Sequence, residues 1–404
     1  MLFRWAFVTL IMVVGINFAA IFHFESANQL EKFLSFGVGF LFLATRKLRV
    51  DILIIIALIL LTTVVMALFS TYLGLGLGRF LRAAFSLGAT FLLLAGEPTK
   101  KDRDLVIRML TALPIIMVGL GIVYNIVGVR TLFYTDFLGA SRLQGTSIPA
   151  GLGTAGYLGA VAAMLGAAMI NKWKYLPLAF INLIILALSA ARMPLALATA
   201  IAGVIYFTMV NRSFIARFVS VSTVVPLVGV FVVLFGESLL TRFESDSLSG
   251  RDLIWTALQV VLDQYPLAGI GLGHQILVVP GDVMFFAATM AAHNEYLRLA
   301  VETGYIGATI IFALLGLMCT LIWLRPQVRK SFVFILMCLS FFVYCRTDNA
   351  ISSTMTPLML VLASFAFSCR LAAPKPVARP AETAAAPRRY SGLGPLPARR
   401  LTVK

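Results

Sequence analysis

The chain has 404 residues, of which 60% are apolar and only 12% are charged. Soluble domains carry roughly 25% charged residues, so this composition excludes an ordinary soluble globular domain. The formal net charge of +16 would suggest a nucleic-acid partner in a soluble protein. Here the basic residues gather in short connectors between apolar segments, which is typical of a membrane protein and argues against nucleic-acid binding.

Apolar runs long enough to cross a bilayer recur along the whole chain. The first follows Arg4; it is long for a signal-peptide core and lacks a convincing cleavage site, so we expect a membrane helix there. The runs predict an all-α polytopic membrane protein with about twelve transmembrane helices. These lie near residues 5–22, 30–45, 51–69, 72–95, 105–127, 152–170, 174–191, 193–210, 214–236, 304–323, 331–347 and 353–371.

The placement of charge orients these helices. With twelve spans both termini lie on one face of the membrane. The basic connectors around Arg46, Lys100, Lys172, Arg212 and Arg325 fall on the same face, which the positive-inside rule makes the cytoplasmic one. The Pro-, Ala- and Arg-rich tail has little to bury, and we expect it to be disordered.

The opposite face carries two long connectors, residues 128–151 and 237–303. The second is the longest segment that cannot be laid out as membrane-spanning helix. The expected organisation is transmembrane helices 1 to 9 in residues 1–236, an outward-facing loop in 237–303 with two or more short helices, transmembrane helices 10 to 12 in 304–371, and the basic cytoplasmic tail in 372–404.

The long loop contains a first short helix. Ser249 followed three residues later by Asp252 is an N-cap with a capping-box-like acid, and the helix should end near Gln264, before Tyr-Pro. The glycine-rich run 269–273 lacks the Lys-Ser/Thr of a P-loop, so we expect a tight turn there.

A second short helix is predicted from Asn294 to about Gly304. Glu295, Arg298 and Glu302 lie at spacings of three and seven residues, so they can form an ion ladder along one side of it.

Two arginines flank expected helix ends. Arg251 lies where a helix N-terminus favours an anion, and its guanidinium suits phosphate; pairing with Asp246, Asp252 or a lipid headgroup is the alternative. Arg192 follows an apolar run at an outer helix boundary, where it could equally be an interface arginine that snorkels towards the headgroups.

Arg79 and Arg82 lie inside a long apolar stretch. Intramembrane arginines are costly and usually face a polar cavity, which makes them candidates for a functional role. Pairing with Glu25, Glu31 or Asp136 is the structural alternative.

Two histidines lie in the loop. His293 precedes the second short helix, and an imidazole there suits proton abstraction near neutral pH, although a solvated loop histidine is the simpler interpretation. His274, after the glycine run, is the weaker candidate. The four cysteines lie in apolar segments without Cys-x-x-Cys spacing, so buried thiols are expected, and no metal or cofactor site is expected. An arginine-rich site with one base suits an anionic, phosphate-bearing substrate delivered from the lipid.

These residues form a recognisable motif. An SGR sequence with a Trp four residues after the Arg, a Pro-x-x-Gly-x-Gly-x-Gly run, HNEYL and ETGYIG resemble the core of the O-antigen ligase and polymerase superfamily. The resemblance covers residues 249–307 and extends more weakly to Arg142-x-x-Gly145 and to Arg192. Length and number of spans resemble the ligase branch.

The resemblance implies a GT-C-like, metal-independent, inverting glycosyltransferase of the bacterial inner membrane, with its site facing the periplasm. The donor would be a polysaccharide on undecaprenyl diphosphate, and the acceptor a sugar hydroxyl of lipid A–core. His293 would be the base, and Arg251 and Arg192 would hold the diphosphate. Further substrate-binding candidates are Arg142, Arg79, Arg82, Asn294 and Arg298.

Other functions remain open at this point. An O-antigen polymerase or an O-linked protein glycosyltransferase shares the motif. A secondary transporter has similar spans, but the chain shows no internal repeat or paired broken helices, and a transporter gives no reason for a long structured loop.

Overall fold

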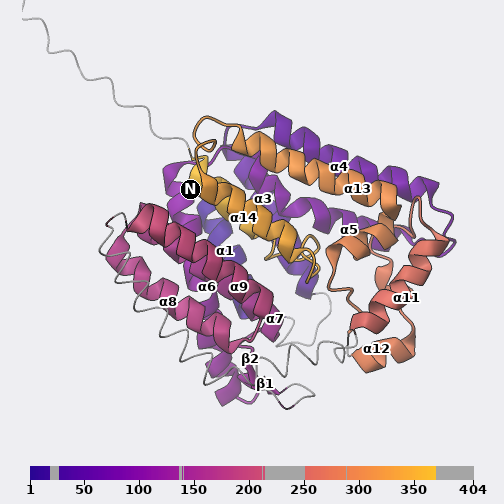
Figure 1. Cartoon of the computed structure of the whole chain (residues 1–404), viewed down its shortest axis with the longest axis horizontal. Helices are drawn as coiled ribbons and strands as arrows, with labels where there is room; N and C mark the ends of the chain where they lie inside the picture. Colours follow the sequence, from indigo (N-terminus) through magenta and orange to yellow (C-terminus); the bar gives the residue numbers. More distant parts are fainter. Residues whose placement is uncertain are drawn as a thin grey trace, which may run out of the picture. The chain divides into compact units, whose positions relative to one another are not determined.

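The computed structural model describes residues 1–18, 27–135, 139, 141–211, 213, 251–287 and 289–369. The expected span 214–236, the Ser249 cap, the acids Glu25, Asp136 and Asp246, and the tail from residue 372 fall outside these ranges. The described part is mostly helical (Figure 1). It departs from the all-α expectation only in a short antiparallel ribbon, in which β1 (Phe133–Thr135) pairs with β2 (Ser141–Leu143).

The helices follow the predicted apolar segments with shifts of a few residues. They are α1 (Leu2–Ile16), α3 (Ala27–Thr45), α4 (Val50–Phe69), α5 (Leu77–Ala89), α6 (Lys100–Ile126), α7 (Pro149–Met169), α8 (Lys172–Leu188), α9 (Arg192–Ile205), α11 (Arg251–Gln264), α12 (Gly281–Ala287), α13 (Glu295–Trp323), α14 (Phe332–Tyr344) and α15 (Leu358–Phe367). Short helical turns are η1 (Phe91–Ala95), η2 (Tyr206–Val210) and η4 (Gln275–Leu277).

Six stretches of the described residues are long and apolar enough to cross a membrane: Val50–Phe69, Leu77–Ala95, Lys100–Ile126, Pro149–Met169, Arg192–Val210 and Glu295–Trp323. Three shorter apolar helices are α1, α14 and α15. By length and composition this is a helical membrane protein. The figure of about twelve spans stays a prediction.

Helix α7 is enclosed by its neighbours. It packs on α6, α8 and α9 (Figure 1). In its most apolar stretch of 18 residues, 89% of the residues are buried inside the protein. Small residues make this possible, since a Cβ added at Gly159 would lie 2.6 Å from Pro114 Cγ of α6 and 2.9 Å from Asn182 Cγ of α8. The N-terminal end of α7 is therefore held in a fixed position.

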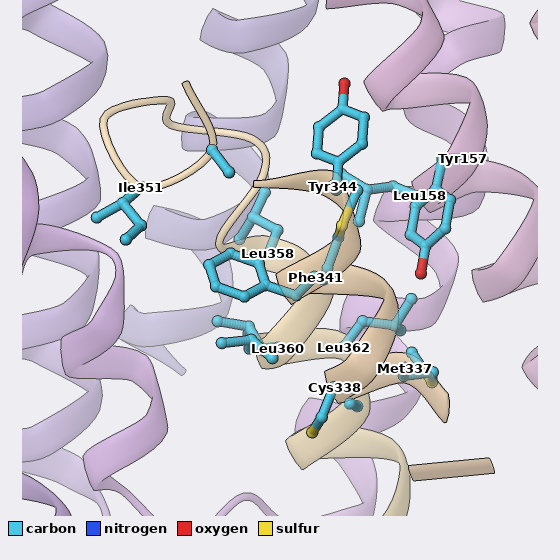
Figure 2. Close-up of a cluster of buried hydrophobic side chains, with 14 of the residues drawn as sticks. Tyr157, Leu158, Met337, Cys338, Phe341, Tyr344, Ile351, Leu358, Leu360 and Leu362 are labelled. Carbon is cyan, nitrogen blue, oxygen red and sulfur yellow. The ribbon is translucent and has the colours of Figure 1, made fainter. Parts of the chain in front are cut away.

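Helices α14 and α15 pack their apolar side chains against α7. Figure 2 shows Phe341 of α14 and Leu362 of α15 in one cluster with Tyr157 and Leu158 of α7. The Tyr157 hydroxyl shares a 2.6 Å hydrogen bond with Ser340 Oγ, which satisfies a polar group inside this cluster. The packing fixes the end of α14, where the chain enters the loop that precedes α15. All four cysteines are buried and free, as predicted.

Helix α13 joins two predicted elements. The short helix expected from Asn294 to Gly304 and the span expected from 304 form one element with a kink at Gly304, whose φ is 67°. A Cβ there would lie 2.1 Å from the Leu267 carbonyl oxygen, so the kink requires glycine. At the kink the glycine run docks on α13: the Ile270 amide donates to the Val301 carbonyl (3.0 Å). Beyond it, α13 lies beside α4 (Figure 1).

Candidate functional site

His293 lies directly before α13, in a loop anchored on both sides. Its Nδ1 lies 3.4 Å from Asp348 Oδ1, and its Nε2 lies 3.5 Å from Thr289 Oγ1. The side chain is one-fifth exposed (21%), so the ring is held yet reachable. Its φ of 46° is in the left-handed region, which costs a non-glycine residue energy and is frequently found at functional sites.

Asp348, in the loop between α14 and α15, was missed by the sequence reasoning. Its carboxylate accepts from the Asn349 amide (2.8 Å) and the Tyr344 hydroxyl (3.0 Å), besides facing His293. Burial alone would raise the pKa of Asp348, but the hydrogen bonds and the charge of His293 outweigh burial and lower it. Asp348 is therefore an ionised partner that orients the imidazole. The sequence signal that could have identified Asp348 is an acidic residue in a short polar run, Arg-Thr-Asp-Asn, directly after an apolar helix.

Tyr344 connects this pair to α7. Its hydroxyl shares a 2.7 Å hydrogen bond with Thr154 Oγ1 of α7, and Figure 2 shows the phenol pointing out of the apolar cluster. The positive charge of Arg251 acts on this phenol. The hydrogen bonds of Tyr344 thus link the His293–Asp348 pair to α7.

Helix α11 is fixed to the histidine loop by the tryptophan of the motif. Trp255 Nε1 donates a 2.7 Å hydrogen bond to the carbonyl of Ala292, the residue before His293. Arg251, one turn earlier, is exposed at the first position of α11, within the first turn where the sequence predicted it. Among the described residues Arg251 forms no ion pair with Asp252, so that alternative is not observed.

Arg192 is the first residue of α9 and is half-buried. Arg142 of β2 donates from Nε to the Ser189 carbonyl (3.1 Å), which ties the ribbon to the turn before Arg192. That turn contains Ala190 at a φ of 51°, a second non-glycine residue in the left-handed region.

The turn before Arg192 also touches α7. A Cβ added at Gly153 would lie 2.3 Å from Ala191 Cβ, and Thr154, the next residue, bonds Tyr344. The structure therefore places the turn before Arg192 against the part of α7 that bonds Tyr344.

A cavity of about 450 Å³, the basic cavity, adjoins the histidine loop. Arg79, Arg82 and Arg298 line it, so three of the predicted binding residues share one site. Other lining residues are Lys32, Gly273, Gln275, Ala291, Glu302, Asn349 and Ser352. The sequence placed the two α5 arginines inside a span over residues 72–95. The structure begins α5 at Leu77, so they lie in its first two turns.

Arg298 and Asn294 have structural roles as well. Arg298 is buried and paired with Glu295 and Glu302, which confirms the predicted ion ladder. Asn294 caps α13, where its Oδ1 accepts from the Leu297 amide (3.2 Å). It also lines a second cavity of about 860 Å³ between α11 and α13, with Trp255 among the other lining residues.

His274 supports the scaffold. It is buried, and its Nε2 accepts from the Gly76 amide (2.8 Å) at the start of α5, while its Nδ1 lies 3.0 Å from the Leu272 carbonyl. The predicted tight turn is confirmed, since Gly269, Gly271 and Gly273 all have positive φ. Within the described ranges no three His, Cys, Asp or Glu side chains converge as metal ligands would.

The arrangement combines two chemical capacities. An imidazole held by an ionised carboxylate can accept a proton from a hydroxyl. Guanidinium groups on several elements around it can bind phosphate and neutralise its charge without further groups.

A comparison with known protein families matches the part of the chain that carries several of these residues. Residues 177–312 match the family described as O-antigen ligase, a segment that runs from α8 into α13 and includes Arg192, Arg251 and His293; Asp348 lies beyond it. A comparison with curated proteins finds no match. Residues 177–312 thus match the O-antigen ligase family, and the predicted resemblance to the O-antigen ligase and polymerase superfamily is confirmed.

Proposed function

We propose that this protein is an O-antigen ligase that transfers a polysaccharide from undecaprenyl diphosphate to a sugar hydroxyl of lipid A–core. The observation that carries the proposal is the His293–Asp348 pair, 3.4 Å apart, beside the motif helix that begins with Arg251. A transport function would not need a base positioned in this way next to a cationic helix end.

The reaction would be a single inverting displacement. The acceptor hydroxyl oxygen attacks the anomeric carbon as the bond from that carbon to the phosphate oxygen breaks, and undecaprenyl diphosphate leaves. The hydroxyl proton passes to the imidazole. Nδ1 faces the Asp348 carboxylate, which can only accept a hydrogen bond when it is ionised, so the ring proton would lie on Nδ1 and Nε2 would accept the proton of the hydroxyl.

Charge on the leaving diphosphate would be stabilised by Arg251 and Arg192. A guanidinium can hold a phosphate through two parallel hydrogen bonds, and that contact strengthens as negative charge develops. Arg142 would act on this group by fixing the turn that precedes Arg192. The proposed reaction requires no metal ion and no cofactor.

The membrane arrangement belongs to the same proposal. Twelve spans in a GT-C-like architecture would place both termini in the cytoplasm of the bacterial cell. The residue 237–303 segment would then face the periplasm, where a lipid-linked polysaccharide and lipid A–core can meet in the inner membrane. The basic connectors predicted from the sequence support this orientation.

The experiment is lipopolysaccharide banding from cells that lack the protein and are complemented with wild type or with His293→Ala. A ligase predicts loss of every O-antigen-bearing band, with undecaprenyl-linked polymer of normal length accumulating, and no rescue by the variant. Lipid A–core with a single repeat unit would instead identify a polymerase. An unchanged ladder would redirect the search to transfer onto protein or to transport.

A further inference from the structure

The basic cavity holds more positive charge than its surroundings balance. Lys32 of α3 and Arg79 and Arg82 of α5 form no ion pair among the described residues, whereas the charge of Arg298 is balanced by Glu295 and Glu302. The charges of Lys32 and Arg298 also act on each other. Like charges gathered in one cavity repel, and a bound anion removes that cost.

The same cavity offers an acceptor with no donor. Asn349 Oδ1 is buried and has no hydrogen-bond partner in the described part of the chain, although buried polar atoms are normally paired. A carbonyl oxygen can only accept hydrogen bonds, so the missing partner is a donor, but the atom itself has almost no accessible surface. The excess of positive charge is therefore what makes the cavity suitable for an anionic ligand.

The wall that carries the arginines is held rigidly. A Cβ added at Gly273 would lie 2.7 Å from Ala83 Cβ and 3.2 Å from the Arg79 carbonyl oxygen, so the glycine run packs directly on α5. His274 fixes the start of the same helix through the Gly76 amide. A preformed site loses less conformational entropy when it binds a ligand.

The opposite wall leads to the proposed base. Asn349 follows Asp348 in the chain. Ala291, which also lines the cavity, donates from its amide to Thr289 Oγ1 (3.1 Å), and that oxygen faces His293 Nε2. Arg251, by contrast, approaches the histidine loop from α11 and does not line the cavity. The base therefore lies between two separate cationic regions.

We propose that the basic cavity binds the acceptor saccharide through a phosphate group near the accepting hydroxyl, with Lys32, Arg79 and Arg82 as the phosphate-binding residues. This rests on the proposed ligase function, in which the donor diphosphate occupies the Arg251 region. The positive charges of Lys32, Arg79 and Arg82 exceed the negative charge of Glu31, the carboxylate that acts on Lys32. This excess favours a phosphate, with a charge between about −1.5 and −2, over a single carboxylate.

The test is steady-state transfer by the purified full-length protein, with donor and acceptor varied separately. The acceptors are lipid A–core and the same material treated with phosphatase. The variants are Arg79→Gln and Arg82→Gln, with Arg79→Lys and Arg82→Lys to restore charge. Arg346→Gln is the matched control, since Arg346 lines the other cavity.

Loss of one charge-assisted phosphate contact should raise the acceptor KM by about tenfold or more, with donor KM and kcat nearly unchanged. Phosphatase treatment should raise the acceptor KM of the wild type similarly and have little further effect on the glutamine variants. The lysine variants should recover most of the affinity, and Arg346→Gln should behave as wild type.

A rise in donor KM instead would assign the cavity to the donor and overturn the inference. Equal increases in acceptor KM with native and with phosphatase-treated acceptor would also overturn it, because the arginines would then not be binding a phosphate group. If the wild type transfers no polysaccharide to lipid A–core at all, the proposed ligase function is wrong. This outcome differs from normal transfer by the wild type combined with variants whose acceptor KM is unchanged.

Discussion

Replacing Asp348 with asparagine should slow sugar transfer while leaving the protein folded. The side chain keeps its shape, so an oxygen can still accept from the Asn349 amide (2.8 Å) and face His293 at 3.4 Å. What disappears is the negative charge that holds the imidazole and stabilises it when it carries the proton. A hydrogen bond to a charged group contributes about 1.5–3 kcal/mol, which corresponds to roughly a 10- to 100-fold loss in kcat.

The pH dependence separates this effect from general damage. The pKa of Asp348 is lowered in the folded protein, so its stabilising contribution is present above the ordinary carboxyl value of about 3.9 and is lost only as pH falls through the lower folded value. The carboxylate is therefore ionised throughout the neutral and mildly acidic range. Any fall in kcat towards low pH within that range therefore reports another group. Removing the carboxylate should move this fall in kcat to lower pH, because an anion that favours the imidazolium is gone.

The assay is steady-state transfer to lipid A–core by purified protein between about pH 5 and 9, with kcat measured at each pH. Asp263→Asn is the matched control, since it removes the same charge from an exposed position of α11 where the carboxylate only meets Gln259. Wild-type kcat and an unshifted profile in Asp348→Asn would refute the orienting role. Equal losses in both variants would show a general charge effect instead.

Three further substitutions probe the scaffold and the anion site. Arg251→Lys keeps charge but loses the two-pronged guanidinium, so transfer should fall about tenfold; full activity would exclude bidentate phosphate binding. Trp255→Phe removes the 2.7 Å hydrogen bond to the residue before His293 and should lower kcat several-fold. The rate of transfer is measured together with the yield of detergent-solubilised protein, which should be unchanged. Gly304→Ala should cost at least about 2 kcal/mol of stability, which would appear as a lower unfolding midpoint in detergent. Gly316→Ala, on the same helix but with open space around it, should not lower the midpoint. Equal midpoints for the two variants would contradict the argument that the kink requires glycine.

Local features of the site were predictable because short-range rules govern them. The end of α11 at Gln264, before Tyr-Pro, follows from proline chemistry. The break at Gly304 and the ladder of Glu295, Arg298 and Glu302 follow from glycine and from helical spacing. Each of these depends on residues within a few positions of one another.

Features that depend on distant segments were missed or misplaced. Asp348 lies 55 residues beyond His293, and no local pattern relates the two. The sequence took His274 as a weak candidate for chemistry, but its Nε2 accepts from Gly76, almost 200 positions earlier, and starts α5 there. That contact fixes the start of α5, whose first two turns carry Arg79 and Arg82.

The sequence by itself determined the helical membrane class, the resemblance to the superfamily and the candidate site residues, because hydrophobic run length and short motifs depend on neighbouring positions. Only the tertiary structure decided that His293 has a carboxylate partner and that Lys32, Arg79, Arg82 and Arg298 share one cavity. Packing of α3, α5 and α13 brings those charges together, and side-chain distances between remote helices are set by packing rather than by local sequence.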